Sequence, residues 1–562
     1  MSRACHSLHA CAGMRAELAG HLSITHCDAV HPLSIRAEEQ PGVFAQLKTG
    51  LISKNPKFVG TCLYFLFVAA FFWVMTGAQG GEKSYDLVQN LRAAMAEFTD
   101  VSDHAGWFAF MQKTFPDVVF PVEYYNGQAL EEENLGNVAN YFMLLGAVGV
   151  RQLRAKDNTC NLKKSDKIFP NVKNCFGEYS ILKNDDTTPF GPTVEPGTDR
   201  KFKYSTSTDL GCTSGCMITA QLATYGGGGF FELLPSERSN ETNSAVQEKI
   251  AQLKKDRWLD RQTRAVFVDF AVYSLTTKLM ATVQLWYETK ASGKTSAYIQ
   301  VIPLKMNHLY ISEGSSADLI SEFIVIFLTM LYSANAVRDW FRVGCYEFWG
   351  SGWNVFDIIN YLCMYAAFLM RYLGVINAAN FKFPPPDTDF VYLSATANWV
   401  KSYKYALGFN CIFTFFKILK YLSHIPMFAR LVKVLGACVE DVAAFLINLG
   451  IMAFAFAGAF HLTYGNHMLE FATMGETFMT LYRFSMGDWD VGALQAFQPD
   501  IGIFYFMLWT LLAICLLLNM FVGIIMESYD KVNEQEEKMS MFEYVKKMTA
   551  TEEVEVVVSN EV

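Results

Sequence analysis

Long apolar runs alternate with polar stretches along this chain, and the lengths of the runs predict membrane-spanning helices. A helix needs about 20 apolar residues to cross the hydrocarbon of a bilayer. The first such run covers residues 58–75, and the polar stretch 77–318 follows it. The later runs cover residues 319–337, 355–372, 405–422, 442–462 and 501–526. The pattern therefore predicts six spans, with one large polar domain between the first and the second.

Lysine and arginine residues flank these runs and indicate their orientation. Loops on the cytoplasmic side of a membrane carry an excess of positive charge. The flanking cations are Lys48, Lys54 and Lys57 before the first run and Arg338, Arg342, Lys417, Lys420, Arg430 and Lys433 near later ones. This distribution predicts that both termini are cytoplasmic. The domain at 77–318 and the proline-rich loop at 384–387 then face the extracellular or luminal side.

A short segment between the fifth and sixth runs has the pattern of a re-entrant helix. Residues 471–484 are too polar to span a membrane, and Met486, Gly487 and Asp488 follow them. Irregular backbone at membrane depth must be buried in protein or line water. Around the axis of an oligomer, these residues would form rings of carbonyl oxygens and negative charge, which select cations. The alternative is an acidic extracellular loop between two ordinary spans.

The polar domain alternates strand-like stretches, such as 265–273 and 278–287, with polar turns. Cys160 and Cys175 lie in a polar stretch on the predicted oxidising side, and their spacing favours a disulfide that stabilises by roughly 3 kcal/mol. Cys212 and Cys216 either close a second, smaller loop or remain free thiols. Asn240 begins an Asn-Glu-Thr sequon for glycosylation.

Composition agrees with a membrane protein and excludes other classes. Of 562 residues, 52% are hydrophobic and 15% aromatic, which is more than a soluble chain of this length carries. The formal charge of −9, without a basic run, argues against nucleic acid as a partner. We find no phosphate-binding glycine loop, catalytic triad or paired-carboxylate motif, so the chain is not expected to be an enzyme or to require a cofactor. Ca²⁺ is expected only as a permeant ion or a regulator.

Several motifs in a fixed order resemble the polycystin (TRPP) branch of transient receptor potential cation channels, and most closely its polycystin-2-like subunits. In the polar domain these are VRQLR at 150–154 with Cys160, PFGP at 189–192, ATY at 223–225, WLDR at 258–261, TRA at 263–265 and DF at 269–270. In the pore region they are Gly487-Asp488 and LLNMF at 517–521.

The resemblance implies an α-helical membrane protein with six transmembrane helices. Four of them would form a voltage-sensor-like domain and two a pore domain with a re-entrant pore helix, with an α+β luminal polycystin domain between spans one and two. The expected segments are a cytoplasmic N-terminal segment at 1–57, the first helix at 58–76, the polycystin domain at 77–318, helices two to four at 319–422, a linker helix at 423–441, the pore domain at 442–528 and a short cytoplasmic tail at 529–562.

The resemblance also implies a tetrameric, non-selective channel permeable to Na⁺, K⁺ and Ca²⁺. A non-conducting or modulatory subunit, or a receptor, is the alternative. The expected partners are copies of this chain or related polycystin subunits, membrane lipids and cations. The expected location is the plasma or ciliary membrane, with the endoplasmic reticulum as an alternative.

Particular residues are expected to carry this function. Met486, Gly487 and Asp488 are the predicted selectivity filter. Val522 and Met526, which continue a four-residue repeat from Leu518, are the predicted inner gate, although such a face also suits ordinary helix packing.

Two further pairs resemble regulatory positions of the family. Lys417 and Lys420 resemble gating charges, and the alternative is that they anchor the span at the cytoplasmic headgroups. Asn354 and Asp357 share a helical face and resemble a calcium site, which Arg338 puts in doubt. Hydrogen bonding between helices, with Arg338 as a partner of the pair, is the alternative.

Overall fold

The computed structural model describes residues 56–160, 174–183, 185–193, 200–305, 316–379, 384–423, 426–488, 490–497, 499–513 and 519–535. The chain forms two compact units, 1–415 and 416–562. The first holds a β-rich domain and a set of long helices, and the second holds the predicted pore domain. The helix α12, Leu393–Leu422, begins in the first unit and ends in the second.

An antiparallel sheet of seven strands forms the centre of the β-rich domain. Its order is β11-β10-β9-β2-β8-β5, and β1 pairs with β2. The long strands β9 and β10 correspond to the two stretches that the sequence pattern predicts: β9 begins two residues before the first stretch, and β10 begins one residue after the start of the second. The strands are β1 Asn137–Val138, β2 Phe142–Arg154, β5 Tyr204–Ser205, β8 Gly229–Leu233, β9 Thr263–Ser274, β10 Leu279–Thr289 and β11 Thr295–Lys305.

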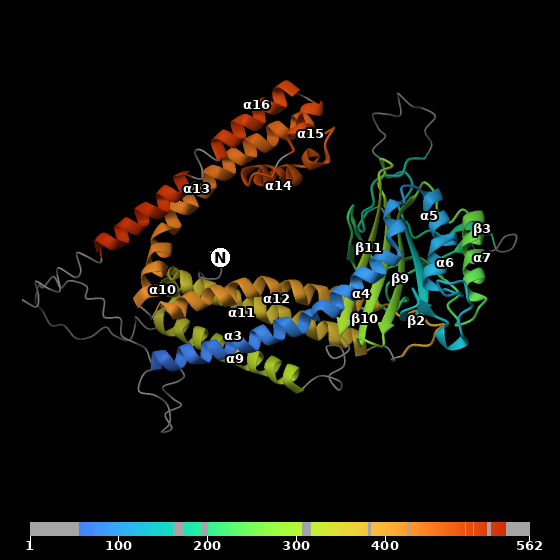
Figure 1. Cartoon of the computed structure of the whole chain (residues 1–562), viewed down its shortest axis with the longest axis horizontal. Coiled ribbons are helices and arrows are strands. Elements are labelled where there is room, and N and C mark those ends of the chain that lie inside the picture. Colours follow the sequence, from blue (N-terminus) through green and yellow to red (C-terminus); the bar gives the residue numbers. More distant parts are fainter. Residues whose placement is uncertain are drawn as a thin grey trace, which may run out of the picture. The chain divides into compact units, whose positions relative to one another are not determined.

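Helices cover one face of this sheet (Figure 1). Because successive side chains of a strand point to opposite faces, Val266, Val268 and Phe270 of β9 join a core with the helices. Residues that alternate with them, such as Phe267 and Ala271, pack in separate clusters on the other face. The covering helices are α4 Gly81–Ala94, α5 His104–Gln112, α6 Thr114–Val119 and α7 Thr242–Lys255, with the 3₁₀ turns η3 Ala96–Asp100 and η4 Glu132–Asn134.

Two small hairpins, β3–β4 and β6–β7, complete the β structure of the domain. Their strands are β3 Phe190–Thr193, β4 Arg200–Phe202, β6 Ile218–Thr219 and β7 Thr224–Tyr225. Ile218 and Tyr225 are buried against Phe267 and Trp286 on the face that the helices leave open.

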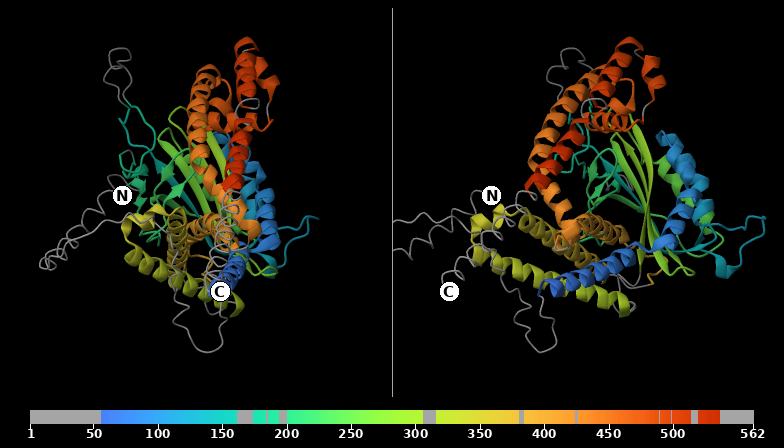
Figure 2. Two further views of the ribbon diagram at one scale, coloured as in Figure 1. Left: turned by 90° about the vertical axis from the view of Figure 1, so that its left-hand side faces the viewer. Right: turned by 60° about the vertical axis from the view of Figure 1, so that its left-hand side comes forward.

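Long helices of the first unit run side by side (Figures 1 and 2). They are α3 Pro56–Gln79, α9 Ser316–Val343, α11 Gly352–Ala379 and α12, with the short α10 Cys345–Gly350 between α9 and α11. Polar contacts join them in the interior: Tyr64 donates a hydrogen bond to the Thr414 carbonyl at 2.6 Å, and the Asn360 amide donates to the Thr414 hydroxyl at 3.1 Å. Each helix contains one of the first four predicted spans.

Among the described residues, four stretches are long and apolar enough to cross a membrane: 60–94, 317–343, 352–379 and 428–464. The predicted fourth span does not meet this criterion, and its helix α12 carries Lys401, Lys404, Lys417 and Lys420. The predicted sixth span contains a shorter apolar helix at 501–513. Length and composition therefore support four of the six predicted spans.

The structure joins two pairs of cysteines in the β-rich domain. The sulfur atoms of Cys160 and Cys175 lie 1.91 Å apart, and those of Cys212 and Cys216 lie 2.00 Å apart. The second pair, which the sequence left open between a small loop and free thiols, is a disulfide in this structure.

We expect peptide mapping without reductant to recover Cys160 and Cys175 in one linked species. Replacing both with serine removes the cross-link from the unfolded chain, and we expect this to lower stability by about 3 kcal/mol. The check is mass spectrometry after alkylation. Full alkylation of both thiols in the absence of reductant would reject the bridge.

Candidate pore segment

The predicted pore domain is a helical hairpin with a short helix packed inside it. Its elements are α13 Pro426–Tyr464, η7 Leu469–Phe471, α14 Met474–Ser485, α15 Val491–Phe497 and α16 Pro499–Thr510, and a further helix covers 519–535. The predicted linker helix and fifth span form one continuous helix, α13. Aromatic residues fill the space between the elements, with Phe460, Phe471, Phe484 and Trp509 buried together.

The short helix α14 corresponds to the predicted re-entrant segment and is anchored at both ends. Thr473 precedes it, and its hydroxyl accepts a hydrogen bond from the amide of Glu476 at 3.2 Å, as N-cap residues do. The Trp509 indole of α16 donates to the Leu481 carbonyl at 3.2 Å. With 12 residues, α14 is about 18 Å long, too short to cross about 30 Å of hydrocarbon.

The predicted filter residues form the C-terminal cap of α14. The amide of Gly487 donates to the Phe484 carbonyl at 3.1 Å, and the amide of Asp488 donates to the Arg483 carbonyl at 3.0 Å. This pair of bonds is a Schellman motif, which places the glycine in the left-handed region, and Gly487 has φ of 87°. The cap turns the chain sharply and leaves Met486, Gly487 and Asp488 exposed.

Asp488 is paired with a cation that the sequence analysis did not identify. The Arg483 Nε lies 2.8 Å from an Asp488 carboxylate oxygen, and both side chains are more than half exposed. The pairing follows from the cap, since the turn at Gly487 returns Asp488 to the last turn of α14. The sequence signal that would have suggested this ion pair is the basic residue Arg483, which lies three positions before Met486, the first residue of the cap.

The predicted gate residues lie on the exposed side of the helix at 519–535. Val522 is 53% exposed and Met526 is 60% exposed in the single chain, one helical turn apart. Leu518, the first member of the four-residue repeat, lies outside the described residues. An apolar face of this kind faces lipid, a second subunit or a pore.

The two predicted voltage-sensing lysines differ in burial. Lys417 is only 2% exposed, whereas Lys420 is half-buried. A buried lysine fits the expectation of a charge held within protein better than a side chain that reaches the headgroups. The voltage-sensing role of the two lysines stays a prediction, and their burial supports it better for Lys417 than for Lys420.

The predicted calcium pair lies at the start of α11. The Asn354 amide donates to the Phe348 carbonyl at 3.2 Å, so it caps the preceding turn, and Asp357 is buried. In the part of the chain that the structure describes, no three His, Cys, Asp or Glu side chains gather as a metal site would require. The pair supplies two oxygen-bearing side chains, whereas Ca²⁺ usually takes six to eight oxygen ligands. The calcium site at this pair therefore stays a prediction.

The predicted glycosylation site is on the surface. Asn240 is exposed in the turn before α7, and Thr242 of the same sequon donates a hydrogen bond to the Glu237 carbonyl. The exposed amide suits an acceptor site, which also stays a prediction.

Comparison with known proteins agrees with this architecture. The Polycystin domain family matches residues 97–307, and the Polycystin cation channel family matches residues 310–532. Human Polycystin-2-like protein 1 is 28% identical over 443 residues, which cover 78% of this chain and 52% of that protein. Polycystin-2 of Danio rerio is 26% identical over 457 residues, with 80% and 48% covered.

A third relative, human Polycystin-2-like protein 2, is 25% identical over 445 residues, which cover 77% of this chain and 67% of that protein. The chain thus spans about half the length of the first two relatives. The matched family is one of channels and not of enzymes. Because the two matched regions run from residue 97 to residue 532 with only a short gap, this membrane protein belongs to the polycystin cation channel family.

Proposed function

We propose that this chain is a subunit of a tetrameric, non-selective cation channel that conducts Na⁺, K⁺ and Ca²⁺. The observation that supports this most directly is α14, a capped helix too short to span, packed between α13 and α16 and ended by an exposed turn. Four copies of that turn around an axis would line a narrow path for ions with backbone carbonyl groups and carboxylates. Copies of this chain or related polycystin subunits complete the tetramer.

The ion pair of Arg483 with Asp488 sets the charge at the mouth of the proposed path. If both residues face the path, the guanidinium offsets the carboxylate, and the net field on a passing cation is weak. Such a site attracts divalent cations only moderately, which is consistent with a non-selective channel. The charge balance of this pair, more than the carboxylate alone, then decides how strongly Ca²⁺ is favoured over Na⁺.

We expect opposite effects from the two partners. Asp488→Asn should lower the permeability of Ca²⁺ relative to Na⁺, and Arg483→Gln should raise it, each by a few fold, because each removes one of the two opposite charges that act on a passing cation. Reversal potentials under bi-ionic conditions measure the ratio. Asp490→Asn, an exposed acidic residue whose carboxylate caps α15, is the matched control. An unchanged ratio in both variants would place the pair away from the ion path.

A non-conducting or modulatory subunit is the alternative function. Purified chain reconstituted in a bilayer distinguishes the two, because a channel gives unitary currents that reverse with the cation gradient. Absence of current from correctly folded tetramers would favour the modulatory role. The remaining expectations, a plasma or ciliary membrane, cytoplasmic termini, Lys417 and Lys420 as voltage-sensing charges and Ca²⁺ at Asn354 and Asp357, stay within this proposal.

A further inference from the structure

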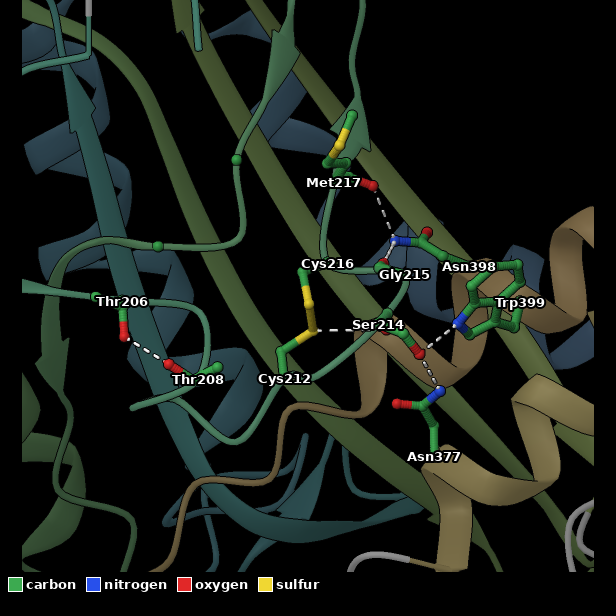
Figure 3. Close-up of a disulfide and its surroundings, with 12 residues drawn as sticks. Thr206, Thr208, Cys212, Ser214, Gly215, Cys216, Met217, Asn377, Asn398 and Trp399 are labelled. Atoms are coloured by element: carbon green, nitrogen blue, oxygen red, sulfur yellow. Dashed lines mark hydrogen bonds between the residues drawn. A yellow bond between two sulfur atoms is a disulfide. The ribbon is translucent and has the colours of Figure 1, made fainter. Parts of the chain in front are cut away.

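A disulfide-closed loop of the luminal domain reaches the ends of two long helices. Cys212 and Cys216 close the loop, and the preceding turn is rigid, because the Asp209 carboxylate accepts hydrogen bonds from the amide and hydroxyl of Thr206 at 2.8 and 2.7 Å. The amide of Cys212 donates to the Ser207 carbonyl at 2.8 Å. Figure 3 shows this loop and the helices beside it.

The tip of the loop makes four hydrogen bonds to α11 and α12. The Ser214 hydroxyl oxygen accepts from the Asn377 amide at 2.8 Å and from the Trp399 indole at 3.3 Å. The Asn398 amide donates to the carbonyl groups of Gly215 and Met217 at 3.1 and 3.4 Å (Figure 3). Residues 163 to 185 positions apart in the sequence are thereby held together at one point.

The fit of the tip requires glycine. Gly215 has φ of 74°, in the left-handed region, and a Cβ at this position would lie 2.5 Å from the Trp399 indole nitrogen. Any other side chain would therefore push the loop away from α12. The contact is a specific one and depends on the loop keeping its closed shape.

The two sulfur atoms differ in their surroundings. Cys212 is buried with Tyr392, just before α12, and with Ala395 in the first turn of that helix, whereas Cys216 is half-buried. Gly227 packs closely against Cys216, where an added Cβ would lie 2.4 Å from the Cys216 Cβ. Because Cys212 is the more buried of the two despite this packing, a reductant reaches the sulfur of Cys216 more readily than that of Cys212.

We propose that the Cys212–Cys216 disulfide is a reversible redox site for dithiol reductants and that its reduction releases the loop tip from α11 and α12. A thiolate of the reductant attacks the Cys216 sulfur, the S–S bond breaks, and Cys212 leaves as a thiolate and takes up a proton. The second thiol of the reductant then displaces Cys216 as a thiol. Two electrons and two protons pass to the protein, and the reductant becomes a disulfide.

Reduction opens the loop without unfolding the domain. The loop is short, and a cross-link stabilises a fold less when it closes a shorter loop. The seven-stranded sheet and its helical core hold no residue of the loop. A separate apolar cluster, with Ala378, Leu393 and Ala397 against the sheet, keeps the helix ends on the domain. The effect of reduction is thus confined to the tip, to the end of α11 at Asn377 and to the first turns of α12.

Hydrogen–deuterium exchange of the purified full chain in detergent tests the proposal without relying on conduction. We expect dithiothreitol to speed exchange about tenfold in peptides covering 206–217 and 393–402, as the loss of the tip hydrogen bonds allows, and to leave β10 unchanged. Alkylation and mass spectrometry verify that Cys212 and Cys216 are free thiols in the reduced sample. Unchanged exchange in a sample with both thiols free, or failure of dithiothreitol to reduce this pair in the folded protein, would overturn the proposal.

Two variants separate the effect of the contact between the loop tip and the helices from general effects of the reductant. In Cys212→Ser with Cys216→Ser, we expect exchange to be fast without dithiothreitol and not to rise when it is added, so any remaining response reports on Cys160 and Cys175. In Gly215→Ala the disulfide is intact but the tip cannot dock, and we expect the same fast exchange. Slow exchange in Gly215→Ala would show that the tip contact does not hold α12.

Discussion

Replacing Met526 with asparagine is expected to raise the current at rest by about tenfold, and replacing Val522 with asparagine to act in the same direction. In the proposed tetramer, four Met526 side chains form an apolar ring, and a narrow apolar pore stops ions by losing its water. An amide keeps water in the constriction. A tenfold rise corresponds to a barrier lowered by about 1.4 kcal/mol.

The structure supports the choice of these two residues and provides a control. Both lie on the exposed side of the helix at 519–535, and Glu527 just beyond them pairs with Lys531 at 2.8 Å, which marks the polar end of the helix. Ile525→Asn places the same amide one position away, turned by about 100° around the helix.

Whole-cell current without stimulus, at matched surface expression, is the measurement. Equal current in the parent and in both gate variants would place the gate elsewhere. A rise of the same size in Ile525→Asn would indicate that the asparagine disturbs packing and does not wet a pore.

Hydropathy and periodicity predicted much of the fold because they report on burial in lipid or in a core. The runs at 58–75, 319–337 and 355–372 became α3, α9 and α11 with a few added residues at each end. The fold class is confirmed, with a β-rich domain between the first and second long helices. The helix of the fourth predicted span, α12, does not meet the criterion of length and composition. It keeps polar groups inside, where the Asn410 amide donates to the Thr414 hydroxyl at 3.4 Å.

The contacts that the sequence did not reveal depend on how distant segments meet. Asn398 and Gly215 are far apart in the chain, and neither belongs to a motif that indicates pairing. Arg483 and Asp488 are close in sequence, yet they pair only because the turn at Gly487 reverses the chain. The filter candidates could be located from sequence, but the cation that offsets their charge could not.

The second large effect concerns a buried charge in the β-rich domain. Arg151 of β2 is 1% exposed, donates hydrogen bonds to the carbonyl groups of Gly226 and Gly228 at 2.6 and 2.8 Å, and lies over the Phe267 ring at 4.7 Å. Its charge acts on Asp269, a buried carboxyl that accepts a hydrogen bond from Gln284 at 2.6 Å. Burial raises the pKa of Asp269 above its usual value, and Arg151 and Gln284 oppose that shift.

We expect Arg151→Leu to destabilise the domain by about 3 to 5 kcal/mol, because it leaves a buried carboxylate without its cation. For a domain of roughly 240 residues this lowers the Tm by about 6 to 20 °C. Thermal unfolding of the full chain in detergent, followed by intrinsic fluorescence, measures the change. Arg261→Leu removes an exposed arginine of the same domain and should leave the Tm within about 2 °C of the parent.

The pH dependence and a double variant identify the carboxyl group as the cause. Without Arg151 the pKa of Asp269 rises further in the folded state, so the folded protein binds the proton more tightly than the unfolded chain does. The loss of stability is then small below the unfolded pKa and grows as pH rises toward the folded value. We expect Arg151→Leu to lose less stability at pH 5 than at pH 7, and Asp269→Asn to restore part of it in the double variant. If the loss is equal at both pH values and the double variant is no more stable than Arg151→Leu alone, then Arg151 acts through its hydrogen bonds to Gly226 and Gly228 and not through its charge.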